Sequence, residues 1–212
     1  MDTGLGTGLA TRCASLAPGT RNVYQAVLRR FAATGRPPEP AELEAAERPF
    51  DLAAGQLLAE LVAADLLGLD DAGRIRMAYP FSTGPTPHVV AIAGGASVYS
   101  MCALDALGIP PMLGVDAVVT SADPVTGAPV KVTFSGGLAS WDPPGAVLYV
   151  GRTGHDGTTE QVSCGNLNFF ASPDSAGQWA SQHPEVTGSV LDQARAQTLG
   201  AQTFVPLLET GT

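Results

Sequence analysis

The sequence predicts an α+β fold in which an N-terminal three-helix unit of winged-helix-like outline packs on a mixed β-sheet domain with flanking helices. The N-terminal third has apolar residues at helical spacing, whereas the chain from His88 onward has β-branched runs separated by turn residues. With 212 residues and 45% hydrophobic content, the chain is long enough to bury a core. We expect a flexible lead over residues 1–20, a helical domain over 21–82 and a β-sheet domain over 83–212.

The first two helices are indicated by apolar spacing and by their ends. Val23, Val27 and Phe31 recur at helical spacing, and the segment ends at Gly35, which Pro37 and Pro38 follow closely. A second, short helix is predicted over residues 40–48, where alanine, glutamate and leucine follow a proline.

The third helix is predicted over residues 51–66, with a leucine-rich face. Residues 69–75 then suggest a turn between two short extended pieces, which completes the winged-helix-like outline. The net charge is −9, from 20 acidic and 11 basic residues, and Lys131 is the single lysine. Because no basic stripe is available to neutralise phosphates, we do not expect a nucleic-acid partner and expect this unit to cover the second half instead.

The second half is predicted to form a sheet of about five strands. The runs of β-branched and aromatic residues that predict it are 88–92, 115–121, 129–134, 146–151 and 167–170. Ser172 followed by Pro173 predicts the start of a helix that continues to about Gln182. A last helix is predicted over residues 189–198.

Composition bears on location and on cysteine chemistry. The first twenty residues have no apolar run like that of a signal peptide, and no segment reaches about 18 consecutive apolar residues, so we expect a cytoplasmic protein without a membrane partner. Cys13, Cys102 and Cys164 are too few and too scattered for a secreted disulfide framework, and none lies in a CxxC zinc pattern. Such thiols are either buried packing residues or chemically active groups.

The segment with the strongest chemical signal is residues 99–108, which the sequence predicts as a short helix bounded by glycines and prolines. Cys102 and Asp105 are separated by i, i+3, so they share a face, and a helix beginning near Tyr99 would favour a thiolate at Cys102. Spacing alone favours Cys102 as a small buried hydrophobe and Asp105 as a solvated or capping acid. Cys164 can likewise be a core residue at the end of a strand.

Several segments in order resemble the organomercurial (alkylmercury) lyase family over roughly residues 20–200. The segments that carry the resemblance are 78–82, 85–90, 102–105, 126–130, 168–172 and 179–181. The resemblance implies an active site made of Cys102, Asp105 and Cys164. The chain departs from the family pattern at Asp123 and at Gly165. The family has a cysteine near Asp123 that we expect to be structural, and it has the second member of a cysteine pair at Gly165, so that here a single thiol remains.

The resemblance implies protonolysis of a carbon–mercury bond, which gives a hydrocarbon and Hg(II) held by the thiolates of Cys102 and Cys164. Mercury is a soft ion that prefers thiolate ligands. Asp105 would deliver the proton, which favours an apolar pocket that raises its pKa, with Met101, Leu104 and Phe169 as expected lining.

No tightly bound cofactor is expected. External low-molecular-weight thiols would be co-reactants, and a mercuric reductase is a candidate partner for the Hg(II) product. Three alternatives remain open at this stage. The first is a non-catalytic soft-metal binder, in which Asp105 has no role, and the second is a redox sensor with a disulfide between Cys102 and Cys164. The third is a relative of the lyases that acts on a different substrate.

Overall fold

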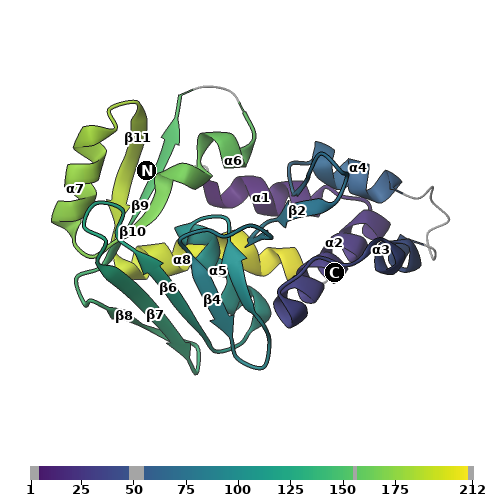
Figure 1. Ribbon diagram of the computed structural model, residues 1–212, viewed down its shortest axis with the longest axis horizontal. Coiled ribbons are helices and arrows are strands. Elements are labelled where there is room, and N and C mark those ends of the chain that lie inside the picture. The colour runs from purple at the N-terminus through teal and green to yellow at the C-terminus, as the bar shows by residue number, and fades with distance from the viewer. Residues whose placement is uncertain (1–4, 48–54, 155–156, 210–212) are drawn as a thin grey trace.

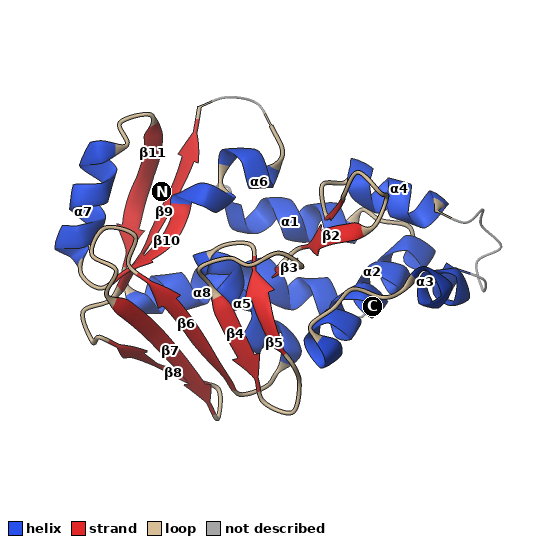
Figure 2. Cartoon of the chain, in the orientation of Figure 1, coloured by secondary structure: helices blue, strands red, loops and turns tan. Residues whose placement is uncertain are grey.

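The structure is a computed structural model that describes residues 5–47, 55–154 and 157–209. Helices α2, α3 and α4 lie together at one end of the molecule, and most strands lie toward the other (Figure 1 and Figure 2). The helices are α1 Leu5–Ala14, α2 Pro18–Thr34, α3 Pro40–Glu47, α4 Gln56–Ala63, α5 Ala103–Leu113, α6 Thr159–Val162, α7 Pro173–Gln182 and α8 Gln193–Leu208, with a short 3-10 helix η2 at Cys164–Asn166.

The strands form two antiparallel sheets. Their bounds are β1 Leu67–Leu69, β2 Ile75–Ala78, β3 Phe81–Ser82, β4 Val89–Ile92, β5 Ser97–Ser100, β6 Ala117–Ala122, β7 Pro129–Ser135, β8 Leu138–Asp142, β9 Val147–Thr153, β10 Leu167–Phe170 and β11 Val186–Leu191. The larger sheet has eight strands in the order β1-β2-β3-β5-β4-β6-β7-β8, and the smaller has three in the order β10-β9-β11. The α+β class is therefore confirmed, but the expected mixed sheet is wrong, because every strand pairing in the described part of the chain is antiparallel.

The predicted number of strands is wrong, although all five predicted runs are strands. The sequence pattern missed four strands, β3, β5, β8 and β11. These strands are short or rich in polar residues and glycine, so their extended conformation depends on hydrogen bonds to the neighbouring strands and not on local sequence. Because β3 pairs with β5, the larger sheet crosses the expected domain boundary between residues 82 and 83.

The N-terminal helices follow the predicted pattern. Val23, Val27 and Phe31 are all buried on one face of α2. The helix ends at Gly35, which has φ +73° and whose N–H donates to the carbonyl of Phe31 at 2.8 Å. The third helix is described from Gln56 to Ala63, and its predicted beginning near Asp51 lies outside the described residues.

The expectation of a flexible lead over residues 1–20 is wrong for the part that the structure describes. Residues 5–14 form α1, and Leu9 and Cys13 are 4% and 1% exposed. The helix packs against α8, the last helix of the chain. Apolar side chains that meet a distant partner are ordered by that contact, which the local sequence does not reveal.

Helix α5 is the central buried helix, and it packs most extensively against α8. Contrary to the prediction, Pro110 and Pro111 lie inside α5, which ends at Gly114 with φ +66°. The two helices approach closely at Gly108 and Gly200, since a Cβ built on Gly108 would lie 2.1 Å from a ring carbon of Phe204.

Helix α8 also differs from its prediction. It begins after Asp192, whose side chain accepts a hydrogen bond from the backbone N–H of Arg195 at 2.9 Å, and it runs to Leu208. Residues 189–191, expected to be helical, are strand because β11 pairs with β9. The helix predicted after Ser172 is confirmed as α7, with the Ser172 side chain accepting from the N–H of Ser175.

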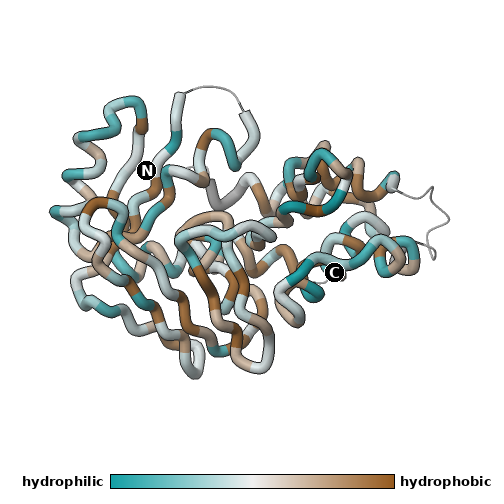
Figure 3. Tube along the Cα trace, viewed as in Figure 1, coloured by the Kyte–Doolittle hydropathy of each residue, from teal (hydrophilic) through white to brown (hydrophobic). Residues whose placement is uncertain are grey.

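Hydrophobic residues concentrate along the central strands and the helices that face them (Figure 3). One large core includes Cys102 and Cys164, and a smaller aromatic cluster lies between β9, β10, β11 and α7. In the part of the chain that the structure describes, no helix combines the length and apolar character that a bilayer crossing requires.

Candidate active site

Cys102 lies at the junction between β5 and α5. It has extended backbone angles, φ −154° and ψ 179°, and is the N-cap of α5, so the helix begins later than the sequence predicted. The backbone N–H of Asp105 donates to Cys102 Sγ at 3.5 Å. The thiol therefore takes the position that a serine or aspartate usually occupies at a helix start, and it brings Asp105 to the same side.

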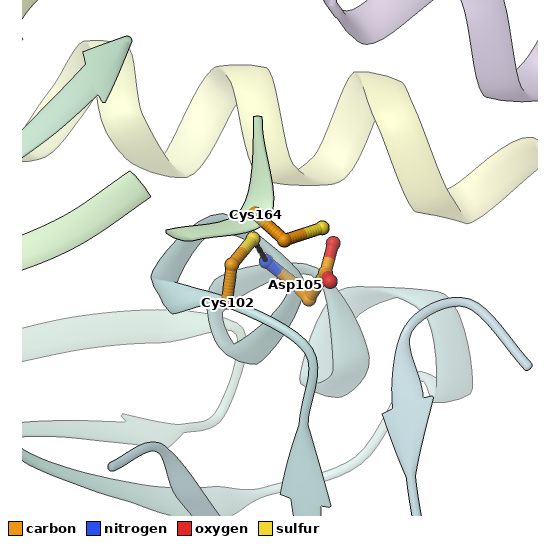
Figure 4. A group of neighbouring side chains, drawn as sticks. All are labelled: Cys102, Asp105 and Cys164. Carbon is orange, nitrogen blue, oxygen red and sulfur yellow. Dashed lines mark hydrogen bonds between the residues drawn. The ribbon is translucent and has the colours of Figure 1, made fainter. Parts of the chain in front are cut away.

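Cys164 reaches the same place from a distant part of the chain. It begins the short helix η2, directly after α6, and its Sγ lies 3.9 Å from the hydroxyl oxygen of Tyr79. In the thiol form Cys164 donates this hydrogen bond, and in the thiolate form the Tyr79 hydroxyl is the donor. Figure 4 shows the Cys164 side chain beside those of Cys102 and Asp105.

The two sulfur atoms and a carboxylate oxygen of Asp105 all lie within 4.8 Å of one another. Cys102, Asp105 and Cys164 are 1%, 4% and 8% exposed. The structure thus brings together all three residues that the sequence singled out, in a group of soft sulfur ligands with one carboxyl group.

These side chains line a pocket of about 250 Å³. Its apolar wall is formed by Leu9, Leu104, Leu167 and Phe204. Leu104 was an expected lining residue, whereas Met101 and Phe169 are not among the residues that line it. Phe169 packs instead against Trp141, with 5.5 Å between ring centroids. The apolar lining residues Leu9, Leu167 and Phe204 were not indicated by any local sequence pattern.

Burial controls the protonation of Asp105. Desolvation raises its pKa to about 8, and hydrogen bonds with Cys102 only partly oppose this effect. Its Oδ2 atom is buried and has no hydrogen-bond partner within the described chain. At neutral pH the carboxyl group is therefore mostly protonated and holds a transferable proton.

The thiol of Cys102 does not follow the expectation from the helix dipole. Its pKa is raised well above the ordinary value, mainly by burial and further by its hydrogen bond with Cys164 and the nearby Asp105 charge. The N–H of Asp105 acts in the opposite direction, as expected at a helix start, but its effect is smaller than that of burial. The free pocket therefore favours a neutral Cys102.

The N-terminal elements supply a polar network at the mouth of the pocket, which the sequence did not predict. Asp65 accepts hydrogen bonds from the backbone N–H and the hydroxyl of Thr159, at 2.9 and 2.7 Å. Arg12 Nη2 lies 3.5 Å from the Asp65 carboxylate and donates to the Thr159 hydroxyl at 3.1 Å. Arg76 also pairs with Glu160 of α6. These contacts join α1 and the end of α4 to the segment that precedes Cys164.

Asp123, one of the two departures from the family pattern, is a buried residue whose hydrogen bonds stabilise the fold. It is 1% exposed, and its carboxylate accepts hydrogen bonds from the N–H of Ala171 and the hydroxyl of Ser175, both at 2.9 Å. Further hydrogen bonds come from the N–H groups of Val125 and Thr126. Together these bonds hold the pKa of Asp123 below its usual range despite desolvation. Asp123 fixes the β6–β7 turn against the start of α7 and does not line the pocket.

The chain matches the model of a known protein family. Residues 81–205, more than half of the chain, match the family model described as alkylmercury lyase. A relative from Streptomyces lividans named alkylmercury lyase is 33% identical over 174 residues, which cover 82% of this chain and 78% of the relative. Another of the same name from Staphylococcus epidermidis is 33% identical over 144 residues, covering 68% of this chain and 65% of the relative.

A solved structure, described as the mercury-bound form of MerB2, has the same fold. Its TM-score is 0.77 with 19% sequence identity, and the match covers 97% of this chain and 99% of that one. The similarity spans the N-terminal helices as well as the sheets, so the whole arrangement of this chain, including the part before residue 81, recurs in that protein.

Proposed function

The chain belongs to the alkylmercury lyase family, and from this premise we propose that it cleaves carbon–mercury bonds with Cys102, Asp105 and Cys164 as its reacting groups. The observation that carries the assignment of residues is the group of two sulfurs and one carboxylate oxygen, all buried and within 4.8 Å of one another. Two thiolates suit a soft mercury ion, and a protonated carboxyl beside them supplies what protonolysis needs.

The first step is capture of the organomercury cation, R–Hg⁺. One cysteine forms an S–Hg bond and displaces the thiol that carried the substrate, and its own proton leaves with that thiol or passes to a neighbouring group. The second cysteine then loses its thiol proton to solvent, binds the same mercury atom as a thiolate and raises the electron density on the carbon. Because the sulfur atoms of Cys102 and Cys164 lie close together, one mercury atom can reach both without a large rearrangement.

Asp105 completes the reaction. Its carboxylic acid donates the proton to carbon as the C–Hg bond breaks, and the electron pair of that bond becomes the new C–H bond. The products are the hydrocarbon R–H and Hg(II) bound by two thiolates, and Asp105 is left as a carboxylate until it is protonated again. The raised pKa of Asp105, about 8, keeps the acid form available at neutral pH.

Hg(II) then leaves by exchange onto an external low-molecular-weight thiol, with mercuric reductase as a candidate acceptor. The thiol is a co-reactant, so the reaction needs no tightly bound cofactor. We further propose that the protein works in the cytoplasm, where such thiols are reduced. We also propose that the helices α2–α4 and the β1–β2 hairpin form a winged-helix-like unit that covers the β-sheet domain in which the reacting groups lie.

The direct test is release of benzene from phenylmercury, or methane from methylmercury, in the presence of excess thiol. The parent protein should form product, and the variants Cys102→Ala, Asp105→Ala and Cys164→Ala should lose it. Tight mercury binding by the parent without product would instead indicate a non-catalytic binder or a different substrate. A disulfide formed by peroxide in place of product would indicate a redox sensor.

A further inference from the structure

We propose that the mouth of the pocket is a subsite for a carboxylate, recognised by Arg152 beside the Arg12–Asp65 pair. The carboxylate belongs either to the organic group of the substrate or to the thiol that removes Hg(II). This inference rests on the proposed lyase function and names the chemical class of ligand that the pocket favours.

Arg152 lies on the face of β9 that is directed toward the pocket. Side chains on a strand alternate between its two faces, so Arg152 shares a face with Leu148 and Val150. Those two residues belong to the large core that contains Cys102 and Cys164, whereas Val147 and Tyr149 belong to the smaller aromatic cluster. Consistent with this alternation, Arg152 is one of the residues that line the pocket, and it is exposed at the end of the strand.

The charges at the mouth leave one guanidinium uncompensated. The carboxylate of Asp65 is already occupied by two hydrogen bonds from Thr159 and by the ion pair with Arg12. The Arg152 side chain makes no hydrogen bond or ion pair with any residue that the structure describes. Arg12 also has a buried Nε atom with no hydrogen-bond partner within that part of the chain. The mouth thus offers one guanidinium, that of Arg152, whose charge no described residue neutralises.

The positive charge at the mouth of the pocket contrasts with the negative net charge of the whole chain. With a net charge of −9 and 11 basic residues among 212, the protein as a whole repels anions. A cation at the mouth of the pocket counteracts that repulsion locally. A guanidinium group also presents parallel N–H donors that match the two oxygens of a carboxylate. The pocket thereby separates an apolar, sulfur-containing floor, suited to R–Hg⁺, from a cationic mouth suited to an anionic group.

The first arm of the test compares two aryl substrates that differ by one carboxylate, phenylmercury and 4-carboxyphenylmercury, each supplied with the neutral thiol 2-mercaptoethanol. Arg152→Gln should lower kcat/KM for the carboxylated substrate by about two- to fivefold, the size expected of one exposed ion pair, and leave phenylmercury unchanged. The difference should shrink in 1 M salt because the charges are screened.

The second arm tests the thiol as the source of the carboxylate. The protein is loaded with Hg(II), and release is followed with 2-mercaptoethanol or with the anionic 3-mercaptopropionate. If the thiol is the ligand, Arg152→Gln should slow release by the anionic thiol about two- to fivefold and leave release by the neutral thiol unchanged. An effect in the first arm alone assigns the carboxylate to the substrate, and an effect in this arm alone assigns it to the thiol.

The matched control is Arg29→Gln, which removes the same charge from an exposed arginine on α2 that does not line the pocket. Equal losses for neutral and carboxylated ligands, or no loss in either arm, or the same loss in Arg29→Gln, would overturn the subsite. Failure of the lyase function is a separate result, because it appears as no benzene from phenylmercury with the parent protein. In that case the Hg(II)-release arm still tests Arg152.

Discussion

The two halves of the candidate site are held in different ways. Cys102 and Asp105 lie three residues apart at the start of α5, a helix that is buried along nearly its whole length and packed closely against α8. Cys164 lies on a three-residue helix that follows the four-residue helix α6. Its segment is anchored by side chains from distant elements, among them Asp65 through Thr159 and Tyr79 directly.

The acid and the first thiol thus belong to the rigid core, whereas the second thiol is positioned by separate polar contacts. Changes near α5 should therefore alter chemistry or global stability. Changes in the contacts around Cys164 should alter the rate while the fold persists, because few apolar contacts are lost there.

The largest effect is expected from Asp105→Asn, which keeps the shape of the side chain but removes the acid. Product release should fall by about 10²- to 10⁴-fold, the usual contribution of general acid catalysis, while mercury binding by the cysteines persists. Single-turnover release of benzene and calorimetric titration with Hg(II) measure the two properties. The control is Asp174→Asn, an exposed acid in the first turn of α7 that should leave both unchanged. Full activity in Asp105→Asn would remove the acid from the mechanism.

The pH dependence follows from the same carboxyl group. Because burial raises the pKa of Asp105 to about 8, the acid form predominates below that pH and is lost above it. The rate of the protonation step should therefore fall about tenfold per unit above pH 8. Single-turnover measurements from pH 6 to 10 test this directly. A step that stays pH-independent to pH 10 would contradict the assignment of the proton to Asp105.

The stability of the protein should show the corresponding trend. In the folded protein Asp105 stays protonated up to about pH 8, whereas in the unfolded chain it ionises near the ordinary aspartate pKa of 3.8. Its favourable contribution is complete below the unfolded value and is lost as pH rises toward the folded value, at up to about 1.4 kcal/mol per unit. Compared with the parent, Asp105→Asn should thus gain relative stability between pH 5 and pH 8. Urea denaturation of both proteins at the two pH values measures this.

Gly108→Ala tests whether α5 is part of the rigid core. A Cβ at this position would lie 2.1 Å from Phe204, so α5 and α8 would have to separate or the ring would have to move. We expect the free energy of unfolding to fall by about 1–3 kcal/mol, as for other overpacked cores. Gly177→Ala is the control, because nothing lies within 4 Å of a Cβ there and helix propensity alone should stabilise it slightly. Unchanged stability in Gly108→Ala would contradict the tight contact.

The sequence could predict the part of the site that is formed by neighbouring residues but not the part that is formed by distant contacts. The pairing of Cys102 with Asp105 follows from an i, i+3 spacing, and the five β-branched runs were sufficient to locate their strands. The helix start was misplaced because β5 extends to Ser100, which only its partner strands determine. No local pattern could show that Tyr79 or Asp65 reaches Cys164 or its segment, since those contacts span 85 and 94 residues. Cys164 itself was found by family resemblance rather than by spacing.

Asp65→Asn tests the anchor of the Cys164 segment. Asp65 has φ +52°, a conformation that asparagine also tolerates, so the backbone should persist while the ion pair with Arg12 is lost. We expect kcat to fall about three- to tenfold with little change in melting temperature, because misplacing a reacting group lowers the rate more than the stability. Asp70→Asn is the control, an acid in the β1–β2 turn that pairs with Arg74 and does not line the pocket. A matching loss of stability would show that the network supports the fold instead.

The smallest effect is expected from Tyr79→Phe. The ring stays buried in the same place, and only the hydroxyl that lies 3.9 Å from Cys164 Sγ is removed. Because a long hydrogen bond to sulfur is weak, the rate of product formation should fall only about two- to threefold, while KM for the organomercurial stays the same. Tyr149→Phe, in the separate aromatic cluster, is the matched control and should have no effect. A loss as large as that in Cys164→Ala would mean that the hydroxyl takes part in the chemistry itself, and the two halves of the site would then no longer differ in the way that their contacts suggest.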